Sequence, residues 1–279
     1  MLKIIYSFLS GLLGRKQKTD LASWEPAWSE FLEDNVHFYA GLNDEEKTIF
    51  HKRVLLFLST TNIESGYFDV SDEDRLLVAA SAIIPVWKFE GWHYFNLKGV
   101  YLLPATFNAD FVCGQPDSLI SGMVGTGPMS GKMALSKPEL YLGFTNSRDK
   151  QNVGIHEFVH LIDMADGECD GYPERLKEHA YSIHWFELVE SKILEINQRN
   201  SNIRPYGATN RAEFFAVATE YFFERPKMLE RKHPELFGAL SEFYQQSVSE
   251  LSRELMPAKN APCVCGSGKK FKRCCLETD

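Results

Sequence analysis

The chain has 279 residues, of which 44% are hydrophobic and 24% charged, and this composition excludes a disordered or low-complexity protein. Thirty Lys and Arg stand against 38 Asp and Glu, and the formal net charge of −8 argues against a globally basic nucleic-acid-binding protein, so no direct DNA binding is expected. Residues 257–279 nevertheless hold five basic and two acidic residues and four of the six Cys, so we expect an acidic body over residues 1–256 and a small basic tail.

The N-terminal segment is apolar but short. Residues 1–14 lack the longer apolar run and the cleavage site of a secretory signal, and the sequence has no run of about 18 apolar residues for a transmembrane helix. We expect residues 1–14 to form a helix docked on the body, with a membrane-surface or partner-docking helix as the alternative. The Cys spacing is not that of disulfides, which favours a cytoplasmic protein.

The first part of the body has the pattern of helices. Apolar residues recur at helical spacing within residues 18–62, where one helix is expected to begin at Asp44 after an Asn43 cap. A further helix is expected from Asp72 to just before Pro85, because proline disfavours helical geometry in the residue that precedes it.

Extended structure is expected next in the chain. Alternating or β-prone residues favour strands at residues 64–70 and 92–112, and a strand pair or strand–turn at residues 133–142. Residues 114–131 hold five Gly and two Pro and are expected to form a loop. From residue 152 almost to residue 255 the pattern is helical, so the order helix, strand, helix predicts the α+β class.

The strongest chemical signal is an HExxH sequence at His156, Glu157 and His160. Positions i and i+4 share a helix face, so both imidazoles can reach one metal ion. Glu157 is turned by about 100° from His156, where it can act as a general base on a metal-activated water. Apolar flanks predict a buried helix, and the alternative is a core helix whose histidines are satisfied without a metal.

A catalytic zinc site needs a third protein ligand. A histidine six residues after the HExxH is excluded, because Asp166 stands there. Glu213 and Glu220 are seven residues apart, near one helix face, and spacing alone favours neither as the ligand. Glu213 has another explanation, a capping box with Asn210. Asp163 is expected either to orient a ligand imidazole or to be a surface acid at a helix end.

Two segments, Asn152–Met164 and Tyr206–Phe223, resemble the Mlc titration factor A family of bacterial zinc metallopeptidases, and the second also resembles the catalytic domain of anthrax lethal factor. The resemblance implies a zincin-like metallopeptidase fold. It implies that Glu213 is the third zinc ligand and that Tyr206 stabilises the oxyanion. Glu220 then becomes a residue that supports the site or packs beside it.

One position departs from that family. Its members usually have Trp after the Leu135-Ser136 pair, and here Lys137 follows, so the segment leading to the site is expected to differ. We also expect a strand near Lys132–Leu135 to pair with an extended peptide substrate.

The expected function is zinc-dependent hydrolysis of peptide bonds, with aminopeptidase or endopeptidase action left open. His156, His160 and Glu213 would hold the catalytic zinc, Glu157 would take a proton from the zinc-activated water, and Tyr206 would assist. The alternative is a regulator that sequesters a transcriptional repressor of the Mlc type, with peptidase activity secondary. A protein that only binds should tolerate loss of Glu157.

The tail, after a linker at residues 257–262, carries a second metal signal. Its thiolates can satisfy a closed tetrahedral zinc, and they are Cys263, Cys265, Cys274 and Cys275. The sequence PCVCGSGKKFKRCC closely resembles the SEC-C motif, which implies a structural zinc knuckle and an adaptor that docks a protein or the ribosome. Cys113 and Cys169 are expected to be bystanders.

Overall fold

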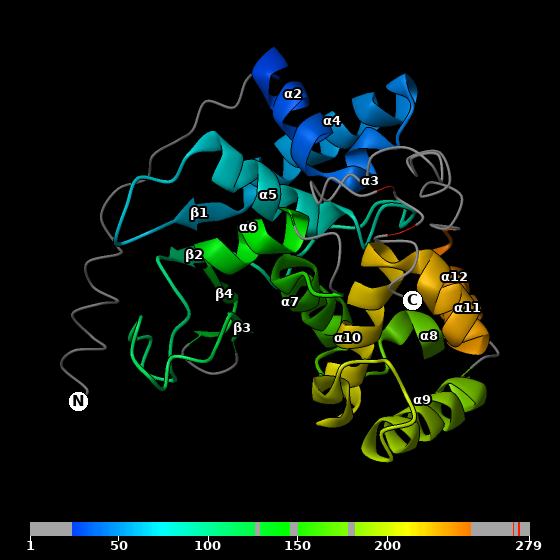
Figure 1. Cartoon of the computed structure of the whole chain (residues 1–279). Helices are drawn as coiled ribbons and strands as arrows, with labels where there is room; N and C mark the ends of the chain where they lie inside the picture. Colours follow the sequence, from blue (N-terminus) through cyan, green and yellow to red (C-terminus); the bar gives the residue numbers. More distant parts are fainter. Residues whose placement is uncertain are drawn as a thin grey trace.

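A computed structural model describes residues 24–125, 129–145, 150–177 and 182–246, together with residues 270 and 273 (Figure 1). It combines many helices with one small sheet, which confirms the α+β class. The strands are β1 (Asn62–Glu64), β2 (Gly99–Leu103), β3 (Gly122–Val124) and β4 (Lys132–Ser136). The helices and 3₁₀ turns are α2 (Pro26–Asn35), α3 (His37–Ala40), α4 (Asp44–Thr60), α5 (Asp72–Ile83), α6 (Lys137–Thr145), α7 (Val153–Asp163), η2 (Met164–Asp166), α8 (Glu174–Lys177), α9 (Ser182–Asn197), η3 (Pro205–Ala208), α10 (Arg211–Glu224), α11 (Pro226–Lys232) and α12 (Pro234–Tyr244).

The four strands lie in the order β1-β2-β4-β3. β1, β2 and β4 run parallel, and β3 pairs antiparallel with β4, Met123 opposite Ala134. The prediction that the strand near Lys132–Leu135 pairs with a peptide is therefore wrong, because β2 and β3 take both edges of β4. The free edge next to α7 belongs to β3.

The helices of the first part begin and end as the sequence predicts. Asn43 caps α4 with a full capping box, its side chain accepting from the Glu46 N–H while Glu46 accepts from the Asn43 N–H. Ser71 caps α5 in the same way with Asp74, and α5 ends before Pro85.

The strands are shorter than predicted. β1 reaches only the first residue of the 64–70 segment, and β2 is the only strand within residues 92–112. Trp92 and Tyr94 pack against the hydrophobic core from an irregular stretch, which explains their aromatic character without a strand. The predicted 114–131 loop contains β3, whose strand geometry depends on pairing with β4 rather than on its own Gly-rich sequence.

Residues 137–142, predicted as part of a strand pair, form the start of α6 instead. Pro138 stands in its first turn, where the missing proline N–H has no helical partner to lose. Lys137 places its ammonium 2.8 Å from the carboxylate of Asp74, which is fully buried, and the Tyr141 hydroxyl donates to the other oxygen at 2.8 Å. The residue that departs from the family pattern thus ties α6 to α5.

The long C-terminal helical stretch is divided into separate helices. Gly167 and Gly171 adopt positive φ angles of 101° and 75°, which end the helical path after α7. Pro205, Pro226 and Pro234 each open a new element, where proline is tolerated.

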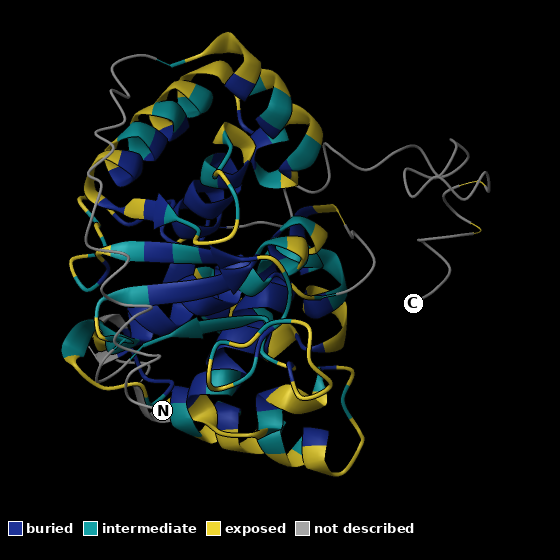
Figure 2. Ribbon diagram, turned by 90° about the vertical axis from the view of Figure 1, so that its left-hand side faces the viewer, coloured by how far each residue is buried: buried dark blue, intermediate teal, exposed yellow. Residues whose placement is uncertain are grey.

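Helix α7 lies at the centre of the molecule, packed on α5, α6 and α10 (Figure 1). All its residues from Gly154 to Asp163 are buried, within the core that Figure 2 shows in dark blue. A Cβ atom on Gly154 would lie 2.1 Å from Ser81 Oγ, so the backbone of α7 packs directly on the Ser81 side chain of α5. Among the described helices, none is long and apolar enough to cross a membrane.

Candidate metal centre

The two histidines of the HExxH sequence face each other on α7. Asn152 caps this helix, its side chain accepting from the Ile155 N–H at 3.0 Å. One turn on, the rings of His156 and His160 have centroids 4.8 Å apart and Nε2 atoms 3.2 Å apart. The helix period therefore brings the two nitrogens to one point, as the spacing predicts.

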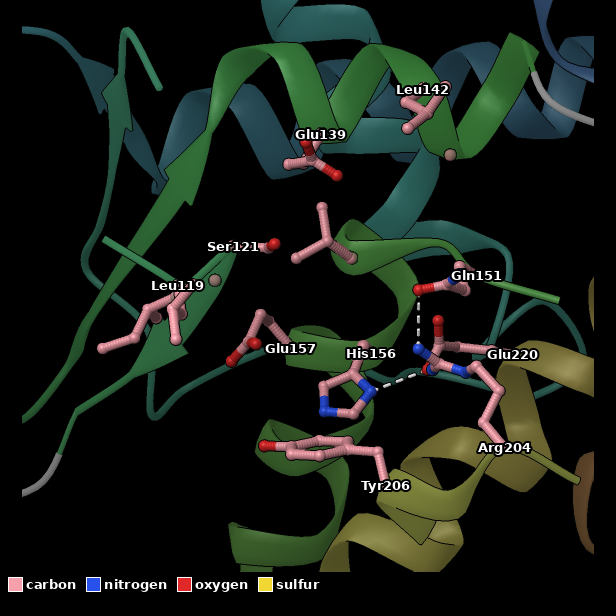
Figure 3. Close-up of a pocket in the computed structure, with 14 residues that line it drawn as sticks. Leu119, Ser121, Glu139, Leu142, Gln151, His156, Glu157, Arg204, Tyr206 and Glu220 are labelled. Carbon is pink, nitrogen blue, oxygen red and sulfur yellow. Dashed lines mark hydrogen bonds and ion pairs between the residues drawn. The ribbon is translucent and has the colours of Figure 1, made fainter. Parts of the chain in front are cut away.

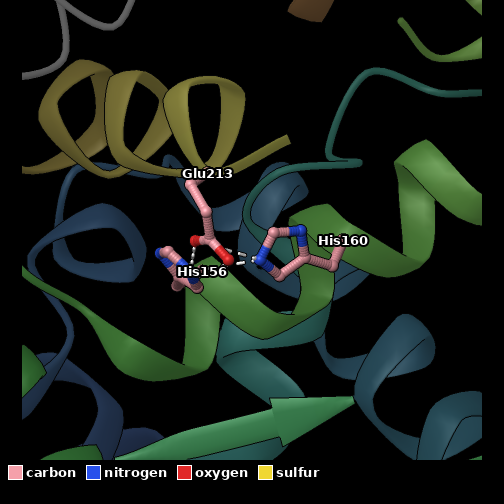
Figure 4. A group of neighbouring side chains, drawn as sticks. All are labelled: His156, His160 and Glu213. Atoms are coloured by element: carbon pink, nitrogen blue, oxygen red, sulfur yellow. Dashed lines mark hydrogen bonds and ion pairs between the residues drawn. The ribbon is translucent and has the colours of Figure 1, made fainter. Parts of the chain in front are cut away.

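Glu213, on α10, completes a group of three (Figure 4). Its Oε2 atom lies 3.0 Å from His156 Nε2 and 3.6 Å from His160 Nε2. The Asn210 side chain accepts from the Glu213 N–H at 2.9 Å, so Asn210 is the predicted N-cap of α10, but this is only one of the two hydrogen bonds of the predicted capping box. The cap uses the backbone of Glu213, and the carboxylate stays turned toward the histidines.

The spacing of these three atoms matches a tetrahedral metal site. Zinc bonds to nitrogen and oxygen of about 2.0–2.1 Å give a tetrahedron with edges of about 3.3–3.4 Å. The observed separations are 3.0, 3.2 and 3.6 Å. Two imidazoles and one carboxylate are also the donor types of catalytic zinc sites, so the three residues fit a zinc ion with one open position.

Glu220 contacts the opposite nitrogen of His156. The His156 Nδ1–H donates to Glu220 Oε1 at 2.8 Å, and the Asn152 N–H donates to Glu220 Oε2 at 2.7 Å. Because a carboxylate only accepts, Nδ1 carries a hydrogen toward Glu220, so a metal would bind Nε2 once the proton there is released. The structure thus places Glu220 at the Nδ1 side of the His156 ring and Glu213 at the Nε2 side. Arg204 also contacts Glu220.

The buried charges of this group shift one another. Burial lowers the pKa of His156, but Glu220 and Glu213 outweigh it and raise the pKa to about 10. Burial raises the pKa of Glu213, but the two histidines outweigh it and hold the pKa well below its usual range. Glu213 is therefore ionised, as a metal ligand must be.

Glu157 lies beside the histidines on the wall of a cavity (Figure 3). Its side chain contacts strand β3, because a Cβ atom on Gly122 would lie 2.7 Å from Glu157 Cγ. Burial raises the pKa of Glu157, while His156 and His160 act against this shift. A carboxylate with a raised pKa accepts a proton more readily than an ordinary one.

Tyr206 reaches the same cavity from η3. Its ring centroid lies 6.0 Å from that of His156, and 52% of the residue is exposed. Burial first, and then the charge of Glu213, raise the pKa of Tyr206 to about 12. The phenol keeps its hydrogen at neutral pH and can donate it to an anion.

Two residues near His160 differ from the expectation. Asp163 is fully buried and accepts from the Gly171 N–H at 2.8 Å, so of its two predicted roles the surface acid is wrong, and the orientation of a ligand imidazole stays a prediction. Cys169, expected to be a bystander, has its Sγ atom 3.7 Å from His160 Nδ1. Burial and then Asp163 raise the pKa of Cys169 to about 12, so it remains a thiol beside the ring. The sequence signal was only its position nine residues after His160.

The cavity has a volume of about 450 Å³. Strand β3 and the residues before it form one wall, α6 covers it, and α7 and η3 form the opposite wall (Figure 3). The part of the chain that the structure describes does not reach the four tail Cys or residues 1–14, so the predicted zinc knuckle and N-terminal helix lie outside it.

The chain is similar to several known proteins. It is 29% identical over 232 residues to the uncharacterized protein slr2042 of Synechocystis sp., covering 78% of this chain and 83% of that protein. It is 30% identical over 141 residues to Mlc titration factor A of Pectobacterium atrosepticum, and 33% identical over 117 residues to Mlc titration factor A of Escherichia fergusonii. These two matches cover 45% and 40% of this chain, and 52% and 42% of those relatives.

Family profiles cover almost the whole chain. The SEC-C motif matches residues 260–277, which confirms the resemblance found in the tail. The profile of the glucose-regulated metallo-peptidase M90 family matches residues 13–245, a span that includes the HExxH helix and Glu213. The chain therefore belongs to the glucose-regulated metallo-peptidase M90 family.

Proposed function

We propose that this metallopeptidase uses one zinc ion, held by His156, His160 and Glu213, to hydrolyse peptide bonds. The observation that carries the proposal is the convergence of three donor atoms at 3.0–3.6 Å in the described part of a metallopeptidase chain. When bound, zinc acts as a Lewis acid that lowers the pKa of a bound water to about 7.

The residues around this position have separate tasks in the proposal. Glu157, whose pKa burial raises, accepts a proton from the attacking water and passes it to the leaving amine. Tyr206 donates its phenolic hydrogen to the oxygen that becomes negative in the transition state. Glu220 holds the His156 ring in the tautomer and orientation that a metal requires.

The substrate is proposed to bind as an extended peptide along strand β3. β3 is an edge strand of the sheet, and its Gly122 lies against Glu157. A peptide added to this edge would pair with the side of β3 that no described strand covers and carry its scissile bond past Glu157. Whether the enzyme trims an N-terminus or cuts internally depends on where the cavity ends.

The test of the function is a Glu157→Gln variant, with Glu187→Gln on the exposed surface of α9 as the control. Zinc content is measured by mass spectrometry of the metal, and cleavage with a peptide library. The proposal expects zinc to be retained by both variants and cleavage by Glu157→Gln to fall by about 10²–10⁴-fold. Unchanged cleavage by zinc-loaded Glu157→Gln would contradict the proposal.

The tail is proposed to be a separate module, residues 257–279, that binds a second, structural zinc through Cys263, Cys265, Cys274 and Cys275. Its SEC-C match and its basic residues support a role in docking a protein or the ribosome. Reduced thiols of this kind suit the cytoplasm. Capture of an acidic partner that salt weakens, and that the four Cys→Ser changes abolish, would support docking.

A second candidate function rests on the names of the relatives from Pectobacterium and Escherichia, Mlc titration factor A. We propose that this chain also binds a transcriptional repressor of the Mlc type. Binding of a purified repressor, measured by calorimetry, should be equal for the wild type and Glu157→Gln if binding is independent of peptidase chemistry. Loss of zinc-site activity with intact repressor binding would separate the two functions.

A further inference from the structure

The cavity is covered by helix α6, and Glu139 lines it from the first turn of that helix (Figure 3). We propose that Glu139 makes the enzyme select peptides with a lysine or arginine side chain next to the scissile bond. This inference rests on the proposed peptidase function, and it names the substrate class of the same site.

Glu139 has a negative charge that the described part of the chain does not neutralise. Its neighbour Lys137 is committed to Asp74, 2.8 Å away on α5. The cationic Arg204, which also lines the cavity, contacts Glu220 and donates to Gln151 Oε1 at 2.8 Å. Among the described residues no cation forms an ion pair with Glu139, so its carboxylate is open to a charge brought by a ligand.

The walls near Glu139 are apolar and exposed. Leu142 follows one turn later on α6 and is 46% exposed, and Leu119, in the segment before β3, is 82% exposed. The stem of lysine or arginine packs readily on such side chains while its charged end stays in a polar setting. Exposed leucines are common on surfaces, but here both line the cavity that also holds Glu139, which forms no ion pair with the described residues.

The same charges act against an acidic substrate. Glu139, Glu157 and Glu220 all line the cavity, and Arg204 is already engaged by Glu220. A glutamate side chain in this space would meet like charges at short range, which disfavours binding.

The experiment compares internally quenched peptides that are identical except for lysine, norleucine or glutamate, placed in turn at each position flanking the cleaved bond. Every peptide is made in two forms, one N-acetylated, so that no α-amino group is present, and one with a free N-terminus. The variants are Glu139→Gln and Glu139→Lys. The control is Glu235→Gln, another first-turn glutamate, exposed on α12 and not part of the cavity.

We expect the wild type and Glu235→Gln to cleave the best lysine peptide about tenfold faster, in kcat/KM, than its norleucine counterpart. Glu139→Gln should reduce this ratio to about 1, and Glu139→Lys should favour the glutamate peptide. A lysine-to-norleucine ratio that is the same in wild type and Glu139→Gln overturns the inference. A preference that appears only with free N-termini also overturns it, and assigns Glu139 to an α-amino group.

Binding separates failure of this inference from failure of the proposed peptidase. Zinc-loaded Glu157→Gln and the double variant Glu157→Gln/Glu139→Gln are titrated against the fluorescent lysine and norleucine peptides. The inference is supported if Glu157→Gln binds the lysine peptide more strongly than the norleucine peptide and the double variant does not. This holds even if the wild type cleaves no peptide. Equal binding of both peptides by both variants contradicts it, even if the wild type is an active peptidase.

Discussion

The two walls of the cavity are built in different ways. The metal-binding wall is formed by α7 and η3 and backed by α10. Its metal-binding side chains are buried or half-buried and contact one another: Glu213 faces both histidines, and Glu220 contacts the far side of the His156 ring. The substrate wall, formed by β3, α6 and the segment before β3, exposes Leu119 and Leu142 and carries Glu139 without a partner among the described residues. A metal needs donors fixed in advance, whereas a substrate needs groups whose interactions are still open.

After Glu157→Gln, the largest effect is expected from Tyr206→Phe, which removes the phenolic donor on η3 beside His156. The phenol, whose pKa is raised to about 12, remains protonated and can donate throughout the working range. We expect kcat to fall by about 10²–10³-fold while zinc content stays constant. Steady-state kinetics and metal analysis check this, and an unchanged kcat would remove Tyr206 from the scheme.

Glu220→Gln removes the negative charge that contacts Nδ1 of the metal-binding His156. It weakens the hydrogen bond to His156 Nδ1 and leaves Arg204 with less negative charge beside it. Loss of such a partner is expected to lower zinc affinity by about 10–100-fold. Competition with a fluorescent chelator measures the affinity, with Glu242→Gln on the exposed face of α12 as control. Equal affinities for the two variants would show that Glu220 only packs.

Gly122→Ala pushes the two walls apart where they touch. Its new Cβ would lie 2.7 Å from both Glu157 Cγ and Val153 Cγ2, so the strand or Glu157 must move. We expect kcat/KM to fall by about tenfold with no change in zinc content, because a displaced base loses its geometry. Gly99→Ala on β2 is the matched control, since its Cβ would meet only Asn62 O at 3.5 Å. Similar kinetics for both variants would contradict the close contact.

The smallest effect is a change in the pH dependence of stability caused by His233, which is 5% exposed. Its ring contacts Oδ1 of Asn202, a residue in the loop before η3, at 2.8 Å. Burial, and then Lys192, lower the pKa of His233. The unfolded chain therefore binds more protons between the lowered pKa and 6.5, and stability falls as the pH falls through this window. We expect the urea concentration at the midpoint of unfolding to fall less for His233→Gln than for the wild type when the pH is lowered from 7.5 to 5.5. Parallel losses would exclude His233 as the cause.

The metal-binding wall was easier to predict from the sequence than the substrate wall. The spacing of His156 and His160 is a property of one helix, so it is visible in five residues. The spacing alone did not decide between Glu213 and Glu220 as the ligand, because both lie near one face of α10. Only the packing of α10 on α7 places Glu213 at Nε2 of His156 and Glu220 at Nδ1.

The substrate wall depends on contacts between distant segments. The edge strand was assigned to the wrong residues, since the position of β4 inside the sheet follows from its pairing with β2, about 30 residues earlier in the chain. Glu139 gave no signal, because residues 137–142 were expected to be extended and only the fold turns α6 over the cavity. Cys169 gave none either, because its place beside His160 depends on the loop after η2.

The zinc stoichiometry of a full-length chain carrying Cys263→Ser, Cys265→Ser, Cys274→Ser and Cys275→Ser tests the central claim most directly. With the tail thiols removed, we expect about one zinc per chain, held by two imidazoles and one carboxylate. Adding Glu213→Ala to this background should remove that zinc at equal free metal concentration. A chain that binds no zinc before the Glu213 change, or keeps it afterwards, would contradict the assignment of His156, His160 and Glu213 as the metal centre.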